Sequence, residues 1–196
     1  MKSRITEKQL RRFYRLVSVP MIDFDCGKLC APGNDGVPAC CDNENVVPVL
    51  FREEYNLHRN NGRFWKRMLP KNKTIKKFID ESASYYVFSS CPGPGGCRRS
   101  RRSLNCRTFP FEPHVSRDGQ VLGLVYTNNA NGECALLGKS QRIYSPVYIS
   151  NSITFWQELF DVYPEEKELY IGESKKRERR FRKQGKRLRI LSNTGV

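Results

Sequence analysis

Apolar residues recur at helical spacing near the amino end of the chain, and four of them share one helix face: Leu10, Phe13, Tyr14 and Val17. Thr6 followed three positions later by Gln9 matches the capping box that begins many helices. Pro20 cannot continue a helix. The pattern therefore predicts a short basic helix over about residues 7–17.

Strand patterns dominate the middle of the chain. Residues 84–89 combine aromatic and β-branched side chains, which is typical of a buried strand. Residues 111–115 and 121–126 flank a segment that contains Asp118-Gly119, a dipeptide typical of hairpin turns. These runs predict a short antiparallel sheet.

Further apolar segments predict helices on either side of this sheet. One helix is expected over about residues 49–58, and a short helical turn over residues 64–69. Residues 144–149 are β-like but contain a proline, which predicts an edge strand or a loop. Ser150-Asn151-Ser152 can cap a strongly apolar helix that ends near Pro164. The predicted fold class is α+β, a small loop-rich domain with flanking helices.

The composition indicates a basic chain with a small hydrophobic core. The 196 residues include 35 Lys and Arg against 20 Asp and Glu, a formal charge of +15, and only 38% are hydrophobic. One modest domain with solvated ends fits these values better than two large cores. We expect a basic amino-terminal helix (residues 1–19), a central domain (20–172) and a basic tail (173–196). A core this small predicts additional stabilisation by metal.

The tail has ten Lys and Arg and one Glu between positions 174 and 190. Because its apolar residues are few and badly spaced, it is expected outside the core, as a solvated helix or a disordered segment. A polyanion such as nucleic acid would suit it, since neutralised phosphates release counterions; a solubilising role is the alternative. The candidate contacts are Lys175, Lys176, Arg179, Arg180, Arg182 and Lys183.

Eight cysteines in a basic chain suggest ligand chemistry, and all eight are candidate metal ligands: Cys26, Cys30, Cys40, Cys41, Cys91, Cys97, Cys106 and Cys134. Thiolates hold Zn²⁺ or iron, and four complete one zinc site or one iron–sulfur cluster. Glycine and proline surround most of these cysteines and permit the tight turns of metal-binding loops. The sequence thus predicts one or two sites holding zinc or an iron–sulfur cluster.

Competing uses of the cysteines fit less well. A radical enzyme's three-cysteine loop would need a third cysteine where Gly33 stands. Disulfides would require export, and the charged first 17 residues do not resemble a secretory signal. No run approaches the ~18 apolar residues of a membrane span, so we expect a cytoplasmic protein with no membrane partner. His58 is expected on the surface, and His114 in a strand, with sulfur contact or ligation as the alternative.

Two of these motifs point to a family. The Cys26-x3-Cys30 pair with the adjacent Cys40-Cys41, and the segment from Cys106 through Arg107 to Phe109-Pro110-Phe111, resemble the YkgJ-type cysteine-cluster proteins, a zinc- or iron-chelating domain. The resemblance covers about residues 23–138. It implies a metal site, and relatives that methylate lysine imply an enzyme as one further possibility.

Charge near the second cysteine group supports a different function. Arg98, Arg99, Arg101 and Arg102 lie between Cys97 and Cys106, and Arg107 follows. Guanidinium groups held on a clamped loop form an anion-binding surface, or they offset the charge of thiolates. The functions left open are a metal-binding protein, with a redox-linked role as one option; a zinc-stabilised nucleic-acid or ribonucleoprotein-binding module; and a protein-modifying, methylase-like enzyme. Glu53 and Glu54 are expected on a solvated helix face.

Overall fold

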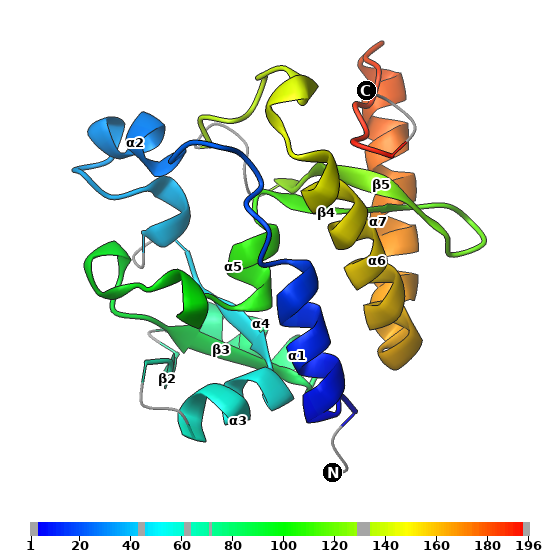
Figure 1. Cartoon of the computed structure of the whole chain (residues 1–196). Helices are drawn as coiled ribbons and strands as arrows, with labels where there is room; N and C mark the ends of the chain where they lie inside the picture. Colours follow the sequence, from blue (N-terminus) through cyan, green and yellow to red (C-terminus); the bar gives the residue numbers. More distant parts are fainter. Residues whose placement is uncertain (1–3, 43–45, 61–63, 71, 129–133, 194–196) are drawn as a thin grey trace. The chain divides into compact units, whose positions relative to one another are not determined.

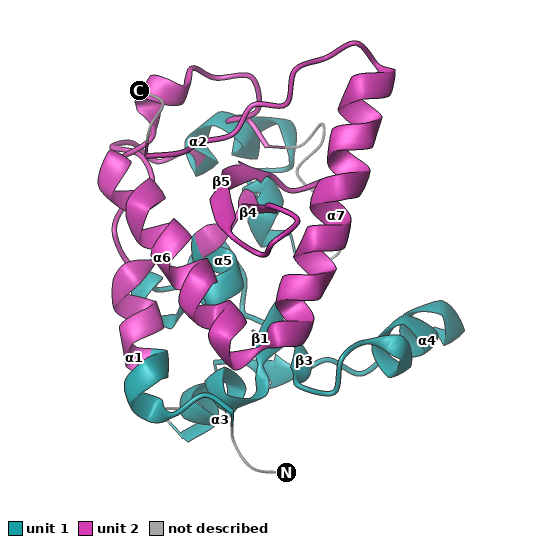
Figure 2. Ribbon diagram, turned by 90° about the vertical axis from the view of Figure 1, so that its right-hand side faces the viewer, with its two compact units in different colours: residues 1–10, 27–107 teal, residues 11–26, 108–196 magenta. Residues whose placement is uncertain are grey.

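The structure is a computed structural model that describes residues 4–42, 46–60, 64–70, 72–128 and 134–193. It has the predicted α+β class, with helices and two small antiparallel sheets (Figure 1). The chain forms two compact units (Figure 2): Met1–Leu10 with Gly27–Arg107 (unit 1), and Arg11–Cys26 with Thr108–Val196 (unit 2). The sequence predicted boundaries near residues 19 and 172, whereas these units divide after residues 10, 26 and 107.

Helix α1 (Glu7–Leu16) confirms the predicted amino-terminal helix. Its capping box is formed, because the Thr6 hydroxyl accepts from the Gln9 backbone N–H at 3.2 Å and the Gln9 side chain accepts from the Thr6 N–H at 2.9 Å. Its apolar face is buried at Leu10 and Phe13. Local sequence signals were sufficient to define this element.

Unit 1 contains a three-stranded antiparallel sheet of order β1-β3-β2, formed by β1 (Val49–Phe51), β2 (Lys66–Arg67) and β3 (Tyr86–Ser90). Strand β3 confirms the strand predicted at residues 84–89. The helix expected over residues 49–58 starts later, as α3 (Arg52–Asn60), because Val49 and Leu50 pair with β3 instead. The helical turn expected over residues 64–69 is also wrong, since Lys66 and Arg67 form β2.

The other helices of unit 1 are short. Asn72 caps α4 (Lys73–Glu81) by accepting from the Ile75 N–H at 2.9 Å. The cysteine-containing segments form α2 (Gly27–Cys30), η1 (Ala31–Gly33), η2 (Ala39–Cys41), η3 (Pro94–Gly96), η4 (Arg99–Arg101) and α5 (Leu104–Thr108), which runs to the boundary of the unit. These segments have the predicted loop-rich character.

Unit 2 is built on the predicted hairpin. Strands β4 (Phe111–Val115) and β5 (Val121–Tyr126) are antiparallel and have the expected bounds. Gly119 has a φ of +89°, which the turn requires. The segment also contains η6 (Gln141–Ile143), α6 (Pro146–Val162) and α7 (Pro164–Lys183).

The strand or loop expected at residues 144–149 is wrong, because α6 begins there. The Ser145 hydroxyl caps the helix by accepting from the Tyr148 N–H at 3.3 Å, and Pro146 occupies the first turn, where its missing N–H costs nothing. Inward-facing Tyr148, Phe155 and Leu159 then form the core of unit 2. The predicted apolar helix after residue 150 is the rest of α6.

The basic tail also differs from its prediction. Helix α7 continues through Gly172 to Lys183, and its Ser174 and Arg177 are buried. The Ser174 hydroxyl accepts from the Val115 N–H of β4 at 2.9 Å. Farther along, Leu191 is buried and exchanges two backbone hydrogen bonds of 2.8 Å with Leu124 of β5. The expectation that this segment stays outside the core is therefore wrong at these residues.

Candidate functional site

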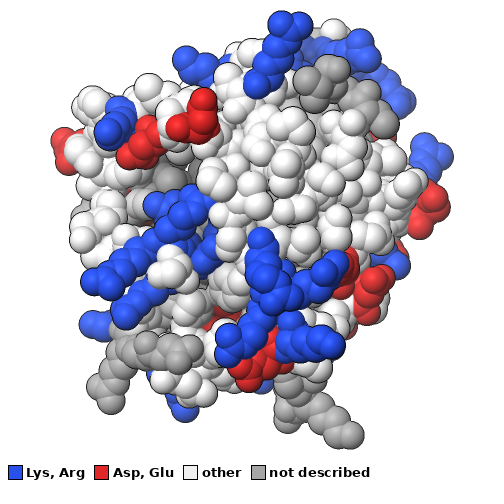
Figure 3. Space-filling model, in the orientation of Figure 1, with Lys and Arg blue, Asp and Glu red and all other residues white. Residues whose placement is uncertain are grey.

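A basic loop stands out in unit 1. The arginine loop, residues 98–102, contains η4 and joins the second cysteine group to α5. Arg98, Arg99 and Arg101 are exposed, while Arg102 is half-buried. Figure 3 shows Lys and Arg side chains gathered over this part of unit 1. The guanidinium groups predicted to bind anions therefore do face solvent here.

Arg107 holds this loop from its half-buried position on α5. Its guanidinium donates to the carbonyl of Arg102 at 2.9 Å, to that of Arg99 at 2.9 Å and to that of Ser100 at 3.2 Å. Five N–H donors in a planar fork make arginine suited to gathering several carbonyls. The sequence placed Arg107 among the anion-binding candidates, whereas its structural use is to shape the loop that carries the others.

Trp65 is a second anchor, which sequence analysis missed. Its indole N–H donates to the Arg101 carbonyl at 3.0 Å. The Arg101 guanidinium lies 5.6 Å from the centre of the Phe64 ring, a cation–π contact. An aromatic pair next to a short strand was the available signal, but only the fold brings it to the loop.

Glu54 is completely buried, which corrects its assignment to a solvated face. Its carboxylate accepts from the backbone N–H of Leu104 at 2.7 Å and from that of Phe51 at 3.3 Å. A buried carboxylate needs such donors to offset its lost hydration. Glu54 thereby fixes the start of α5, from which Arg107 reaches the loop.

The cysteines are divided between the units. Unit 1 contains Cys30, Cys40, Cys41, Cys91, Cys97 and Cys106, and unit 2 contains Cys26 and Cys134. The Sγ atoms of Cys40 and Cys41 are 3.9 Å apart. Cys91, Cys97 and Cys106 pack against an apolar cluster of Leu50, Phe64 and Trp65. All eight lie within the described residues, and none forms a disulfide.

Arg102 interacts electrostatically with three thiols of unit 1, those of Cys97, Cys41 and Cys40. Burial acts to lower the pKa of Arg102, but its hydrogen bond to Cys97 and the charges of Cys97, Cys41 and Cys40 raise that pKa. A hydrogen bond from Cys40 lowers the pKa of Cys41 to about 7, against the effect of burial and with help from Arg102. Burial raises the pKa of Cys106 to about 11. Arg102 thus favours the thiolate form of Cys41, and the use of the whole loop to offset thiolate charge stays a prediction.

The sequence predicts a metal site at the cysteines. Among the described residues, no group of three or more His, Cys, Asp and Glu side chains is placed to hold a metal ion. The sulfurs of Cys40 and Cys41, 3.9 Å apart, would contribute two ligands. The eight-cysteine ligand set and its zinc or iron–sulfur cluster stay predictions.

Neither histidine is fully exposed: His58 is half-buried and His114 is buried. Burial, followed by the charges of Arg107 and Arg101, lowers the pKa of His58 to about 4. His114 is in β4, as predicted, and is buried, with its Nε2 3.2 Å from a carboxylate oxygen of Glu178. Burial lowers the pKa of His114, while Glu178 opposes that shift.

The predicted tail contacts form an exposed basic face on α7: Lys175, Lys176, Arg179, Arg180, Arg182 and Lys183 are all exposed. Two have acceptors within unit 2, since Lys176 pairs with Glu173 at 2.8 Å and Arg180 donates to Asn128 at 2.6 Å. This face is the second cationic surface that the sequence anticipated.

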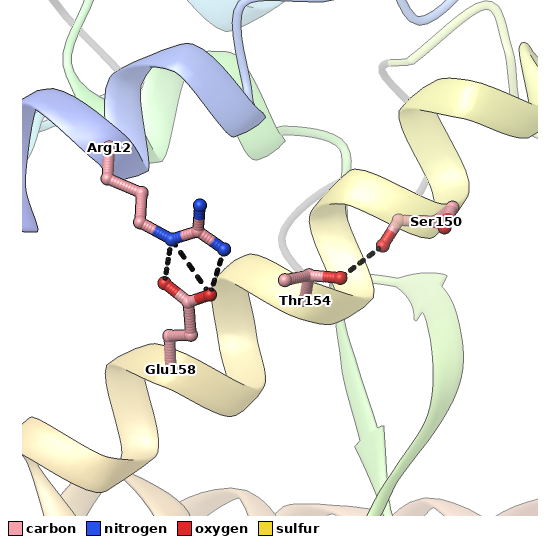
Figure 4. Close-up of polar contacts among 4 residues, drawn as sticks. All are labelled: Arg12, Ser150, Thr154 and Glu158. Atoms are coloured by element: carbon pink, nitrogen blue, oxygen red, sulfur yellow. Dashed lines mark hydrogen bonds and ion pairs between the residues drawn. The ribbon is translucent and has the colours of Figure 1, made fainter.

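Other basic residues have structural roles. On the unit 2 part of α1, Arg12 donates to Glu158 of α6, with Nε 2.7 Å from Oε2 (Figure 4). One turn earlier on α6, the Thr154 hydroxyl donates to the Ser150 carbonyl at 3.1 Å. Arg12, although exposed, is thereby paired with a carboxylate inside unit 2.

Comparison with known proteins adds one partial similarity. A glycosyltransferase family 92 protein of Caenorhabditis elegans is 29% identical over 111 residues. The aligned region is 50% of this chain and 22% of that protein, so the chain spans about a fifth of its relative. No family model and no solved structure matches, and the YkgJ resemblance stays a prediction. Within the described ranges, no helix is long and apolar enough to cross a bilayer.

Proposed function

We propose that this chain is a nucleic-acid-binding module that contacts the phosphate backbone through the arginine loop of unit 1. The observation that carries the proposal is that two side chains hold the backbone of the loop while three of its arginines are exposed. Arg107 and Trp65 bind its backbone carbonyls, while Arg98, Arg99 and Arg101 are exposed.

Such anchoring favours binding because the loop is ordered before the ligand arrives. Less conformational entropy is then lost on association. Guanidinium groups match phosphate in planar, two-pronged hydrogen bonds, which suits them to a backbone irrespective of sequence. The exposed cations of α7 supply a second surface of the same chemistry on unit 2.

The test is a triple substitution, Arg98→Gln, Arg99→Gln and Arg101→Gln, in the full chain. Affinity for a single-stranded 20-mer is measured by filter binding over a range of salt concentrations. We expect affinity to fall at least about tenfold, and the slope of log affinity against log salt to become shallower by about 2, since three phosphate contacts are lost.

A matched control changes three exposed lysines of α4 in the same unit: Lys73→Gln, Lys76→Gln and Lys77→Gln. Both triple variants remove three positive charges. If the two weaken binding equally, the loop has no specific role. If the chain binds no oligonucleotide at 50 mM salt, the proposed function is wrong.

Metal binding is a second candidate function. The observation in its favour is the 3.9 Å separation of the Cys40 and Cys41 sulfurs. Two thiolates on one tetrahedral zinc lie about 3.8 Å apart when each Zn–S bond is about 2.3 Å. Such a site would still need two further ligands, and the described residues do not supply them around this pair.

A further inference from the structure

The carboxyl-terminal segment of unit 2 folds back after α7. Gly185, with a φ of +63°, follows the helix, and the Lys186 N–H donates to the Phe181 carbonyl at 3.0 Å. The chain then returns to β5, where Leu191 pairs with Leu124. Helix α7, β5 and the returning segment together line a cavity of about 840 Å³, a size typical of small-molecule sites.

Gly123 permits the return. A Cβ atom at this position would lie 2.3 Å from the Leu191 carbonyl oxygen, closer than real Cβ atoms approach backbone. The glycine also has a φ of +156°, which other residues rarely adopt. The wall formed by the returning segment therefore depends on a residue without a side chain on β5.

The cavity is lined by apolar and basic residues. Six of them are Lys or Arg: Lys139, Arg177, Arg180, Lys186, Arg187 and Arg189. No Asp or Glu is among its described lining residues. Arg180 is held in place, because its guanidinium donates to Asn128 at 2.6 Å and lies 5.7 Å from the centre of the Phe181 ring. Six like charges around one space favour a ligand with several negative charges.

Arg177 is the most unusual of these six. Its side chain is 2% exposed and forms an ion pair with Glu112 of β4. Its Nε and Nη1 nonetheless have no hydrogen-bond acceptor among the described residues. A buried guanidinium with unfilled donors is costly, and an anion in the cavity that it lines would supply the missing acceptors.

Aromatic rings form the apolar part of the cavity. The Phe111 ring lies 4.9 Å from that of Tyr126 and 5.1 Å from that of Tyr144, centre to centre. The Tyr126 hydroxyl lies 2.7 Å and the Tyr144 hydroxyl 3.2 Å from the Leu136 carbonyl oxygen, and the two hydroxyls hydrogen-bond to each other. Because their polar ends are satisfied, the rings contribute mainly apolar surface, which accommodates a planar group.

We propose that this cavity binds a small organic polyphosphate with a planar ring, with the phosphates at Arg177, Arg180 and the returning segment and the ring against Phe111 and the two tyrosines. The proposal concerns unit 2 and a small ligand. It is therefore independent of nucleic-acid binding by the arginine loop.

The test uses calorimetric titration of the full chain with three probes: ATP, inorganic tripolyphosphate and adenosine. ATP has both the phosphates and the ring, and each of the others has one part. We expect ATP to bind at least about tenfold more tightly than tripolyphosphate, and adenosine to bind least. Equal affinity for ATP and tripolyphosphate, or no ATP binding at millimolar concentration in 50 mM salt, would overturn the proposal.

Two variants with a matched control locate the site. Arg187→Gln with Arg189→Gln removes two exposed cavity cations and should weaken ATP binding at least about tenfold. Arg117→Gln with Arg142→Gln removes two exposed cations of unit 2 that do not line the cavity, and should leave affinity within about twofold. Equal loss in both pairs contradicts the assignment. Arg177→Lys, which keeps the charge but not the fork, should also weaken binding if it folds.

Discussion

The carboxylate of Glu54 accepts a 2.7 Å hydrogen bond from the backbone N–H of Leu104, fifty residues farther along the chain. Its other oxygen accepts from the N–H of Phe51, directly before α3. One buried acid thereby joins the start of α3 to the start of α5. The arginine loop depends on this contact, because α5 carries Arg107.

Replacing Glu54 with alanine should lower the free energy of unfolding by about 1–3 kcal/mol, since two backbone donors lose their acceptors in a buried site. Glu54→Gln keeps one acceptor oxygen and should cost less. Urea unfolding followed by circular dichroism measures both values. The control Glu81→Ala removes an exposed pair with Lys77, so it should cost no more than about 0.5 kcal/mol. Equal losses at positions 54 and 81 would contradict the structural role.

Ser174 connects the basic helix α7 to strand β4 within unit 2, and its substitution tests this contact. Ser174→Ala leaves the Val115 N–H without its acceptor and should cost about 1–3 kcal/mol of stability. The neighbouring exposed Lys175, changed to alanine, should alter stability by less than about 0.5 kcal/mol. Thermal unfolding of both variants gives the comparison. A neutral Ser174→Ala would restore the interpretation of residues 173–196 as a solvated tail.

Gly123→Ala should release the carboxyl-terminal segment from β5, because the new methyl group would collide with the Leu191 carbonyl. Trypsin should then cleave after Lys186, Arg187 or Arg189 much faster than in the parent chain, as mass spectrometry of timed digests would show. Gly172→Ala is the control, since a Cβ there meets open space and should stabilise α7 by about 0.5–1 kcal/mol. Unchanged cleavage in Gly123→Ala would mean that the segment is not held there.

His58 should make stability depend on pH. Its pKa is about 4 in the folded chain because of burial and nearby arginines, against about 6.5 when unfolded. Between these values the unfolded chain binds a proton that the folded chain does not. The stabilising contribution is therefore complete above about pH 6.5 and is lost as pH falls toward 4. In His58→Gln, urea unfolding at pH 7.5 and 4.5 should differ less than in the parent; an identical difference would exclude His58 as the cause.

The metal content of the protein tests the predicted role of the cysteines. If the cysteines hold zinc or an iron–sulfur cluster, protein purified without oxygen should contain stoichiometric metal, and chelation should lower its melting temperature. Cys41→Ser and Cys106→Ser each remove one of the eight candidate ligands, and both should then reduce the metal content. Metal-free protein with unchanged stability would leave the cysteines as packed or electrostatically paired thiols.

Sequence patterns predicted the elements whose signals are local. The capping box of Thr6 and Gln9 and the Asp118-Gly119 turn each determine structure within a few residues. Residues 49–51 were misassigned because their strand conformation depends on pairing with β3, a distant segment. At residue 145, the cap and the following proline were present, but β-like side chains around them favoured the wrong interpretation.

The same distinction between local signals and tertiary contacts applies to the candidate sites. Charge density alone located the exposed arginines of the loop. It could not show that Arg107 turns inward to backbone carbonyls, or that Ser174 and Arg177 are buried, because each of those facts depends on a partner supplied by tertiary structure. The cavity in unit 2 likewise needs the chain reversal at Gly185.

Each of the two units contains one tryptophan, so fluorescence can follow each unit separately. The chain has two tryptophans, and Trp65 belongs to unit 1 while Trp156 belongs to unit 2. Trp65 donates to the carbonyl of Arg101, so its emission should respond to disturbance of the arginine loop. Trp156 is packed among Phe155, Phe160 and Tyr170 and should shift only when that core opens. Fluorescence of the two single-tryptophan variants would show whether the units melt together or one after the other.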